Sequence, residues 1–306
     1  MPTTPLTFSS ADDVWFATNR ITDLAADSVS SIDAGDFRIT LVRAGSYWWD
    51  GGALFGVVPK TMWSRHQASD DLNRIEAGFN CFVVEDGKSR ILIETGGGIR
   101  HDARALERTR MAPDVSAAGS VAGAGFEPES FDIVINTHLH WDHCGGNTID
   151  LADGRVAPAF PNARYVTQRG ELEHAREQHP RDAVSYRAVN YEPLVESGRM
   201  HLLDGDVEVA PGVRLQVAPG HNRDMMVVIV GGGREKWCHF ADLAPYGAQI
   251  TPTWVAAFDL FPVQTIETRT QLFGRALAEG WRCSFWHDPK ISFARVTERD
   301  GKLALA

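Results

Sequence analysis

Cysteine is scarce in this chain and irregularly placed. The four cysteines are Cys81, Cys144, Cys238 and Cys283, and no two of them have CxxC spacing. This pattern excludes a disulfide-stapled miniprotein and a cysteine-type zinc finger. We therefore expect four reduced and mostly buried thiols, which are typical of a cytoplasmic protein.

The sequence also lacks a long hydrophobic run. Its apolar segments, such as residues 225–230, have the length of a strand, whereas a membrane helix needs about 20 apolar residues. The N-terminal segment MPTTPLTFSSADDVWF has neither the basic region nor the apolar stretch of a secretion signal. We expect a soluble, cytoplasmic protein with no membrane partner.

Positive charge is in deficit. The chain has 30 Lys and Arg against 40 Asp and Glu, which gives a formal net charge of -10. Binding to nucleic acid depends on clustered cations that neutralise phosphates. The charge balance therefore argues against a nucleic-acid partner and leaves a small molecule as the expected ligand.

Hydrophobic residues make up 43% of the 306 positions, which is ordinary for a folded protein. Helices are predicted at 169–178, 182–197 and 263–279, among many short strands, while residues 96–98 and 112–125 are interpreted as flexible loops. Helices interspersed with strands predict a layered α/β (α+β) fold. No break in composition divides the chain, so we expect a single domain over residues 1–306, with 1–35 as an N-terminal arm or short helix.

The strongest functional signal is the segment HLHWDH at residues 138–143, which follows a predicted buried strand. Residues at i and i+2 of an extended chain point to the same side. His138 and His140 can therefore direct their imidazoles at one point, and Asp142 and His143 can serve a second point close by. Zinc needs three or four protein ligands of these types, so the spacing predicts a metal site that other segments complete.

Three further candidate ligands occur in the second half of the chain. His221, Asp242 and His287 each come shortly after a predicted strand. A single histidine or aspartate at such a place is more typical of a turn or a cap. All three in one chain with HLHWDH indicate convergence on one metal site, provided that their strands are neighbours.

In this order, the HxHxDH motif, the Gly-His pair at 220–221, the isolated aspartate and the late histidine resemble the metallo-β-lactamase superfamily, over about residues 37–287. The resemblance implies a four-layer αββα sandwich with two metals at one edge of its sheets. It implies that His138, His140 and His221 hold the first metal and that Asp142, His143 and His287 hold the second. It also implies that Asp242 bridges the two metals. The segment Glu94-Thr95-Gly96 resembles the supporting Asp-Thr-Gly of the family, with Glu in place of Asp.

Within the superfamily, the chain is similar to the acyl-homoserine lactonases and to methyl parathion hydrolase-like enzymes. The similarity rests on THLHWDH with the Gly-Gly-Asn that follows it, and on GGALFGVVPK at 51–60. It implies a hydrolase of a small lactone or ester, with catalytic roles for Asp142, Asp242 and Tyr246. Tyr246 is the nearest match to a substrate-contacting tyrosine that follows the bridging aspartate. The family also makes a homodimer an option.

The implied mechanism uses two divalent ions that share a hydroxide nucleophile. An imidazole-rich ligand set favours zinc, with iron, manganese or cobalt as alternatives. Three other functions remain open: a phosphotriesterase of the methyl parathion hydrolase type, an iron-dependent sulfur dioxygenase, and a metal-bound binding protein without turnover.

Two groups of residues near these motifs have a structural alternative. Cys144 follows His143, and we interpret it as a packing residue because the ligand set is already complete. The aromatic and apolar residues of the 48–63 region can line a substrate pocket or belong to the core. They are Trp48, Trp49, Phe55, Met62 and Trp63.

Overall fold

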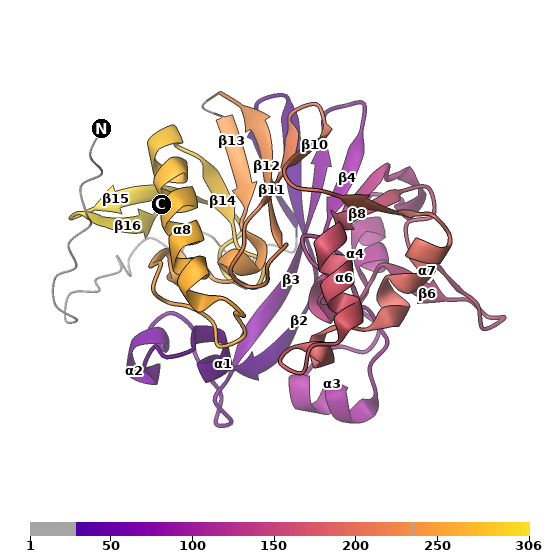
Figure 1. Ribbon diagram of the computed structural model, residues 1–306, viewed down its shortest axis with the longest axis horizontal. Helices are drawn as coiled ribbons and strands as arrows, with labels where there is room; N and C mark the ends of the chain where they lie inside the picture. The colour runs from indigo at the N-terminus through magenta and orange to yellow at the C-terminus, as the bar shows by residue number, and fades with distance from the viewer. Residues whose placement is uncertain (1–28, 234) are drawn as a thin grey trace.

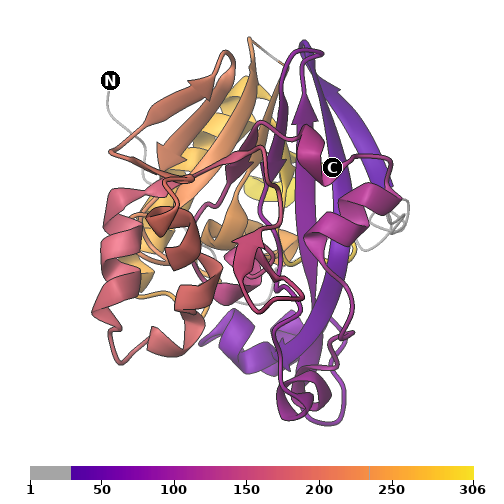
Figure 2. The same ribbon diagram turned by 90° about the vertical axis from the view of Figure 1, so that its right-hand side faces the viewer.

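Two large mixed sheets lie face to face, with helices on their outer sides (Figures 1 and 2). The computed structural model describes residues 29–233 and 235–306. The short helix considered for the N-terminal segment and most of the expected arm therefore lie outside the described residues.

The first sheet has the strand order β1-β2-β3-β4-β5-β8-β9. The pairs from β1 to β4 are antiparallel, and β4, β5, β8 and β9 run parallel. The strands are β1 (Val29–Ala34), β2 (Phe37–Asp50), β3 (Arg74–Glu85), β4 (Arg90–Ile93), β5 (Ile133–Ile135), β8 (Arg164–Gln168) and β9 (Met200–Leu203). The expectation of an arm over 1–35 is wrong for residues 29–34, because they form β1 and pair with β2.

The second sheet has the order β10-β11-β12-β13-β14-β15-β16. All of its pairs are antiparallel except β13 with β14, which run parallel. The strands are β10 (Val207–Ala210), β11 (Val213–Val217), β12 (Met226–Gly232), β13 (Glu235–His239), β14 (Arg282–Ser284), β15 (Ala294–Arg299) and β16 (Lys302–Leu305). A separate small sheet pairs β6 (Thr148–Asp150) with β7 (Val156–Pro158).

Helices cover the outer faces of both sheets, α4, α6 and α7 on one side and α8 on the other (Figures 1 and 2). The α-helices are α1 (Gly51–Phe55), α2 (Lys60–Trp63), α3 (Ala103–Thr109), α4 (Ala117–Gly123), α5 (Trp141–Cys144), α6 (Arg169–Glu177), α7 (Glu192–Glu196) and α8 (Pro262–Glu279). The 3₁₀ helices are η2 (Pro128–Ser130), η3 (Ala183–Ser185), η4 (Ala188–Asn190), η5 (Ala241–Leu243) and η6 (Gly247–Ile250). In the described part of the chain, no helix combines the length and hydropathy that crossing a membrane requires.

Three apolar layers hold this arrangement together. Between the sheets, Ile39 and Phe82 of the first sheet share one cluster with Val228 of the second. A second cluster lies under the helices of the first sheet and a third lies under α8. Each sheet is therefore buried on both faces, as the predicted αββα sandwich requires.

Two segments differ from the sequence-based expectation. Residues 182–197 form two 3₁₀ helices and the short α7 instead of one helix. Tyr186 is extended there, because it bridges to His140. Proline is tolerated only in the first turn of a helix, so α7 begins at Glu192, just before Pro193. Residues 117–123, expected in a flexible loop, form α4, which Ser116 caps and which buries Val121 against the first sheet.

Candidate metal centre

The HLHWDH segment begins directly beyond the carboxyl end of β5. The chain leaves this central strand at Asn136, and Thr137 accepts a hydrogen bond from the Met226 amide of the second sheet at 3.0 Å. His138 follows at once, and α5 then carries Asp142 and His143. The segment is therefore held between the two sheets at one edge of the sandwich.

A close contact between two glycine segments fixes this turn. A Cβ atom on Gly98 would lie 2.2 Å from the Gly145 carbonyl oxygen, and one on Gly145 would lie 2.3 Å from that of Gly97. The backbones approach so closely that a side chain would not fit. The expectation of a flexible loop at 96–98 is therefore wrong, since these glycines are buried against the turn that presents the histidines.

The second half of the chain delivers its candidates to the same edge. His221 follows β11, Asp242 lies in η5 after β13, and His287 follows β14. Because β13 and β14 are parallel neighbours, their carboxyl ends emerge at one edge. All seven predicted ligands come together there, and each is between 0% and 9% exposed.

Six of the seven predicted ligands form two groups of three, and a further group combines Glu94 with His138 and His143. In each group the ligand atoms lie within 4.8 Å of one another. We call His138, His140 and His221 the first triad, and Asp142, His143 and His287 the second triad. Each triad has the residue types and the convergence of a metal site.

Asp242 lies between the two triads. Its Oδ1 is 3.2 Å from His143 Nε2 and 3.5 Å from His287 Nε2, both of the second triad. Its Oδ2 is 3.5 Å from His221 Nε2 of the first triad. One carboxylate therefore faces ligand atoms of both groups with different oxygens.

Hydrogen-bond partners orient the histidines from behind. His221 Nδ1 lies 3.0 Å from Asp259 Oδ1, and His143 Nδ1 lies 3.2 Å from Glu94 Oε1. His287 Nδ1 lies 3.1 Å from the Gly78 carbonyl oxygen. Such partners fix the tautomer and leave the opposite nitrogen free for a metal.

Buried atoms without partners show that a metal ion fits this centre. The Nε2 atoms of His138 and His143 and the Oδ1 atom of Asp242 are buried and make no hydrogen bond, and His140 presents its Nδ1 to the first triad, 3.1 Å from His221 Nε2. Buried polar atoms are rarely left unpaired. A cation at each triad would satisfy these atoms with the nitrogen and oxygen donors that zinc accepts.

The two triads differ in electrostatics. In the first, burial and the neighbouring histidines lower the pKa of His138, and burial lowers the pKa of His140 to about 3. In the second triad, burial opposes protonation of the histidines, but nearby carboxylates outweigh it. These are Asp242 and Glu94 for His143, and Asp242 and Asp142 for His287. They hold the pKa of His143 well above its usual range and raise the pKa of His287 to about 9. The metal-free second triad is thus rich enough in negative charge to retain protons.

Three supporting residues were not predicted from the sequence. The Tyr47 hydroxyl donates to Asp142 Oδ2 at 2.9 Å. Asp259, which orients His221, accepts a hydrogen bond from Thr265 at 2.8 Å. Glu171 accepts from the backbone amide of Leu139, between the first two histidines. The contacts of these residues with the HLHWDH segment and with His221 join distant parts of the chain, and no local motif marks them.

Glu94 occupies the place that the family resemblance suggested. Its Oε1 accepts hydrogen bonds from the Thr137 backbone amide and hydroxyl, and it also lies beside His143. Glu94 has φ 62°, in the left-handed region that few residues adopt. The residue with this backbone conformation is the one that differs from the Asp-Thr-Gly pattern of the family.

Tyr246 lies beside the metal centre, with its hydroxyl bonded to the backbone. Its side chain is fully buried, and its hydroxyl donates to the Glu76 carbonyl oxygen at 2.9 Å. Its ring packs beside His287, whose ring centroid lies 6.4 Å away, and its contact with a substrate stays a prediction. The hydroxyl that donates to a carboxylate of the centre, that of Asp142, belongs to Tyr47.

The structure places Cys144, Phe55 and Trp63 in the packed interior, whereas a pocket role for Trp48, Trp49 and Met62 stays a prediction. Cys144 is buried in α5 and its thiol contacts the Leu139 carbonyl oxygen at 3.2 Å, as a packing residue would. Phe55 and Trp63 are buried in the core and stack on each other. Trp48, Trp49 and Met62 are partly buried.

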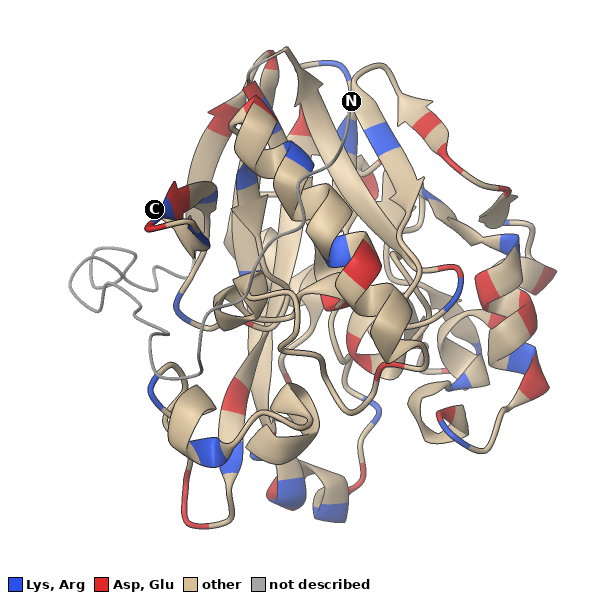
Figure 3. Cartoon of the chain, turned by 60° about the vertical axis from the view of Figure 1, so that its left-hand side comes forward, with Lys and Arg blue, Asp and Glu red and all other residues tan. Residues whose placement is uncertain are grey.

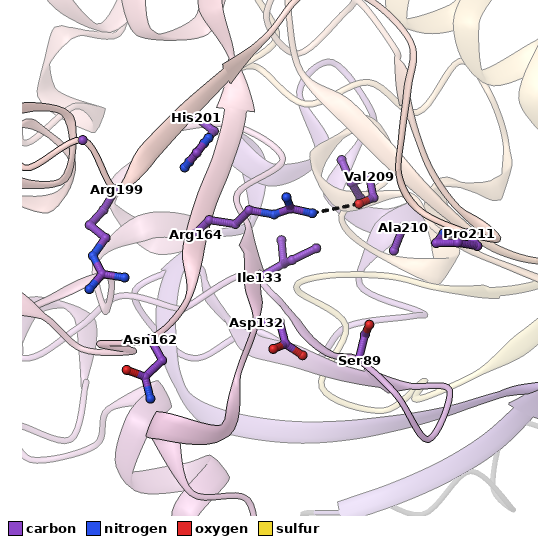
Figure 4. Close-up of a pocket in the computed structure, with 11 residues that line it drawn as sticks. Ser89, Asp132, Ile133, Asn162, Arg164, Arg199, His201, Val209, Ala210 and Pro211 are labelled. Carbon is purple, nitrogen blue, oxygen red and sulfur yellow. Dashed lines mark hydrogen bonds between the residues drawn. The ribbon is translucent and has the colours of Figure 1, made fainter.

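A surface cavity of about 630 Å³ lies elsewhere (Figure 4). Its lining includes Ile133 and Arg164, the first residues of β5 and β8, and Arg199, which precedes β9. The metal ligands follow the opposite end of β5. Charge around the molecule is mixed, since Figure 3 shows Lys and Arg interspersed with Asp and Glu along the helices and loops.

Comparison with known proteins assigns the family. Residues 78–273, more than half of the chain, match the metallo-beta-lactamase superfamily model. The protein belongs to this superfamily, and its two sheets with flanking helices are the fold of that family. The matched segment contains six of the seven clustered ligands, and His287 lies beyond it.

Individual relatives are more distant. An N-acyl homoserine lactonase of Bacillus cereus is 29% identical over 154 residues, which are 46% of this chain and 54% of that protein. The match thus spans about half the length of the lactonase. A probable metal-dependent hydrolase from Staphylococcus aureus has 25% identity and a TM-score of 0.82, covering 90% of this chain and 99% of that one. AidC, a dizinc quorum-quenching lactonase, has 18% identity and a TM-score of 0.72, covering 92% and 97%.

Proposed function

We propose that the protein is a metal-dependent hydrolase that opens a small lactone or ester at a centre of two divalent metal ions. The observation that carries the proposal is the position of Asp242, whose two oxygens face ligand nitrogens of both triads. A carboxylate in this position can be shared by two ions and set their separation.

The chain supplies a complete set of ligands. The first triad would hold one ion, the second triad the other, and Asp242 both. When bound, the two ions would supply a hydroxide at neutral pH and polarise the carbonyl oxygen of the substrate. Zinc is the expected metal, because neutral imidazoles dominate the set.

The two carboxylates of the centre have a further part in the mechanism. Burial opposes their ionisation, but contacts with His287 and His143 hold the pKa of Asp142 and of Asp242 below the usual range. Both therefore stay ionised at neutral pH. An ionised carboxylate can accept a hydrogen bond from an attacking water and orient it toward the substrate.

The substrate class is supported by the relatives. The Bacillus cereus protein is an N-acyl homoserine lactonase, and AidC is a quorum-quenching lactonase. Both share this chain's superfamily or fold, so a lactone is the first substrate to test. A phosphotriester is the second, because the same centre can stabilise a leaving alkoxide from phosphorus.

The test combines elemental analysis with a substrate panel. The full chain, analysed as purified and without added metal, is expected to hold two metal ions and to hydrolyse N-acyl homoserine lactones faster than aryl esters or phosphotriesters. A preference for aryl phosphotriesters would replace lactone by phosphotriester as the substrate. Two bound metals without turnover of any substrate would indicate a binding protein, and a single iron would favour an oxygenase.

A further inference from the structure

The long strand β2 contains an irregularity just before the metal centre. Arg43 pairs with Asn80, but the next paired residue, Ser46, faces Gly78. Three steps along β2 thus correspond to two along β3, which is a β-bulge with one extra residue. Gly45, inside the bulge, has φ +95°, which favours glycine.

The bulge decides which way Tyr47 points. Val42 and Ala44 belong to the core cluster on the helix-covered side of the first sheet. In a regular strand the next residues on that face would be 46 and 48, because side chains alternate. The extra residue reverses the alternation, so Tyr47 joins the cluster of Val42 and Ala44. Bulges frequently re-aim a side chain next to an active site.

Tyr47 is held tightly where the bulge places it. Its ring stacks on Phe79 at a centroid distance of 5.2 Å and meets the edges of Trp141 at 5.4 Å and His287 at 5.5 Å. The side chain is 5% exposed. The hydroxyl thereby has a fixed direction, toward Asp142.

The hydroxyl acts on the carboxylate of the second triad. It donates to Asp142 Oδ2 at 2.9 Å, and the same oxygen lies 3.4 Å from His287 Nε2. Two ligands at about 2.0–2.2 Å from one zinc ion lie roughly 3.4 Å apart at the tetrahedral angle. Tyr47 thus contacts both residues whose ligand atoms already have this spacing.

We propose that Tyr47 is a positioning residue for the second metal ion: its hydroxyl fixes the rotation of the Asp142 carboxylate while its ring braces His287. The inference rests on the proposed two-metal centre and adds a residue to it.

The test is the Tyr47→Phe variant of the full chain, titrated with zinc against a chromophoric chelator. Phenylalanine keeps the stacked ring and removes the donor. We expect the first ion to bind as in the wild type and the second to bind 10- to 100-fold more weakly, the usual effect of losing such a partner. Equal affinity for the second ion in variant and wild type would overturn the proposal, even if activity fell.

Two controls make the result specific. Tyr165→Phe removes another buried hydroxyl, which bonds to the backbone of Asn147 and Phe160, and it is expected to leave both zinc affinities unchanged. In an Asp142→Ala background, Tyr47→Phe should cause no further loss of affinity, because its partner is already gone. A further loss there would show that Tyr47 does not act through Asp142.

The outcomes also separate this inference from the proposed function. A wild-type chain that binds one zinc ion at most would refute the two-metal centre itself. Two ions in the wild type with an unaffected Tyr47→Phe variant would refute the role of Tyr47 alone. If Tyr47→Phe melts too low for titration, the same comparison is made with Gly274→Ala added to both proteins. Gly274 is exposed in α8 with no atom near its Cβ position, and alanine is the better helix former there.

Discussion

The two triads of the centre share an edge of the sandwich but are built from different chemistry. The first has three imidazoles, supported by Asp259 behind His221. The second combines two imidazoles with a carboxylate and is supported by Glu94 and Tyr47. The second triad therefore depends more on negative charge and on the orientation of a rotatable carboxylate, whereas the first depends on the placement of rings.

The largest loss of activity is expected from replacing Asp242, the one predicted ligand that faces both triads. Asp242→Ala removes a group that faces both triads, so both ions should bind more weakly. Activity should fall on the order of a thousandfold, beyond the 10- to 100-fold typical of a supporting partner. Kinetics at saturating zinc and metal content measure the two effects. Asp204→Ala, at an exposed salt bridge with Arg169, is the control, and retention of near-wild-type activity by Asp242→Ala would contradict the shared position.

A large loss of stability is expected from a substitution at the glycine contact that fixes the HLHWDH turn, which supplies ligands to both triads. Gly98→Ala would place a methyl group 2.2 Å from the Gly145 carbonyl oxygen, and φ +65° at this position adds backbone strain. We expect a loss of about 2–4 kcal/mol in the free energy of unfolding. Urea unfolding of the metal-free protein measures it.

The control for this substitution lies on the opposite outer layer. Gly274→Ala in α8 meets no atom within 4 Å and should stabilise the protein by about 1 kcal/mol. If Gly98→Ala were as stable as the wild type, the glycine contact would not be what holds the turn in place.

The sequence predicted the contiguous part of the centre because its geometry is local. The spacing of His138 and His140 on an extended segment already places two imidazoles together. His221, Asp242 and His287 needed one more condition, that their strands are neighbours, and the parallel pairing of β13 with β14 provides it for the last two. Strand ends that carry isolated ligands are thus predictable once the order of the strands is known.

The rest depends on contacts that no local pattern encodes. Tyr47 meets Asp142 across 95 positions of the chain, and only after a bulge has reversed the alternation of its strand. Tyr246 was selected because it follows Asp242 closely, but its hydroxyl is bonded to a backbone carbonyl. Residues 182–197 have a helical composition, yet the bridge from Tyr186 to His140 keeps part of the segment extended. In each case a long-range contact overrides the local preference.

The support of each triad can be removed separately. Asp259→Asn keeps the shape of the side chain beside His221 but removes its charge, so the first zinc ion should bind about 10-fold more weakly and the second unchanged. Glu94→Gln, beside His143, should weaken binding of the second zinc ion by about the same factor and leave the first unchanged. Two-step zinc titrations of both variants measure these changes. Equal weakening of both ions by either variant would show that the triads are not independent.

The smallest expected effect is a difference between the triads in the number of protons released when each metal ion binds. At pH 7.5 the metal-free His287, with a pKa of about 9, and His143, with a raised pKa, retain protons, whereas His138 and His140 are neutral. A metal ion must displace those protons, so binding of the second ion should tighten as the pH rises from about 7 to 9. In the first triad only His221 has a raised pKa, so fewer protons should be released there. Calorimetric titration in two buffers of different ionisation enthalpy counts the protons for each ion, and a larger release with the first ion would reverse the electrostatic contrast between the triads.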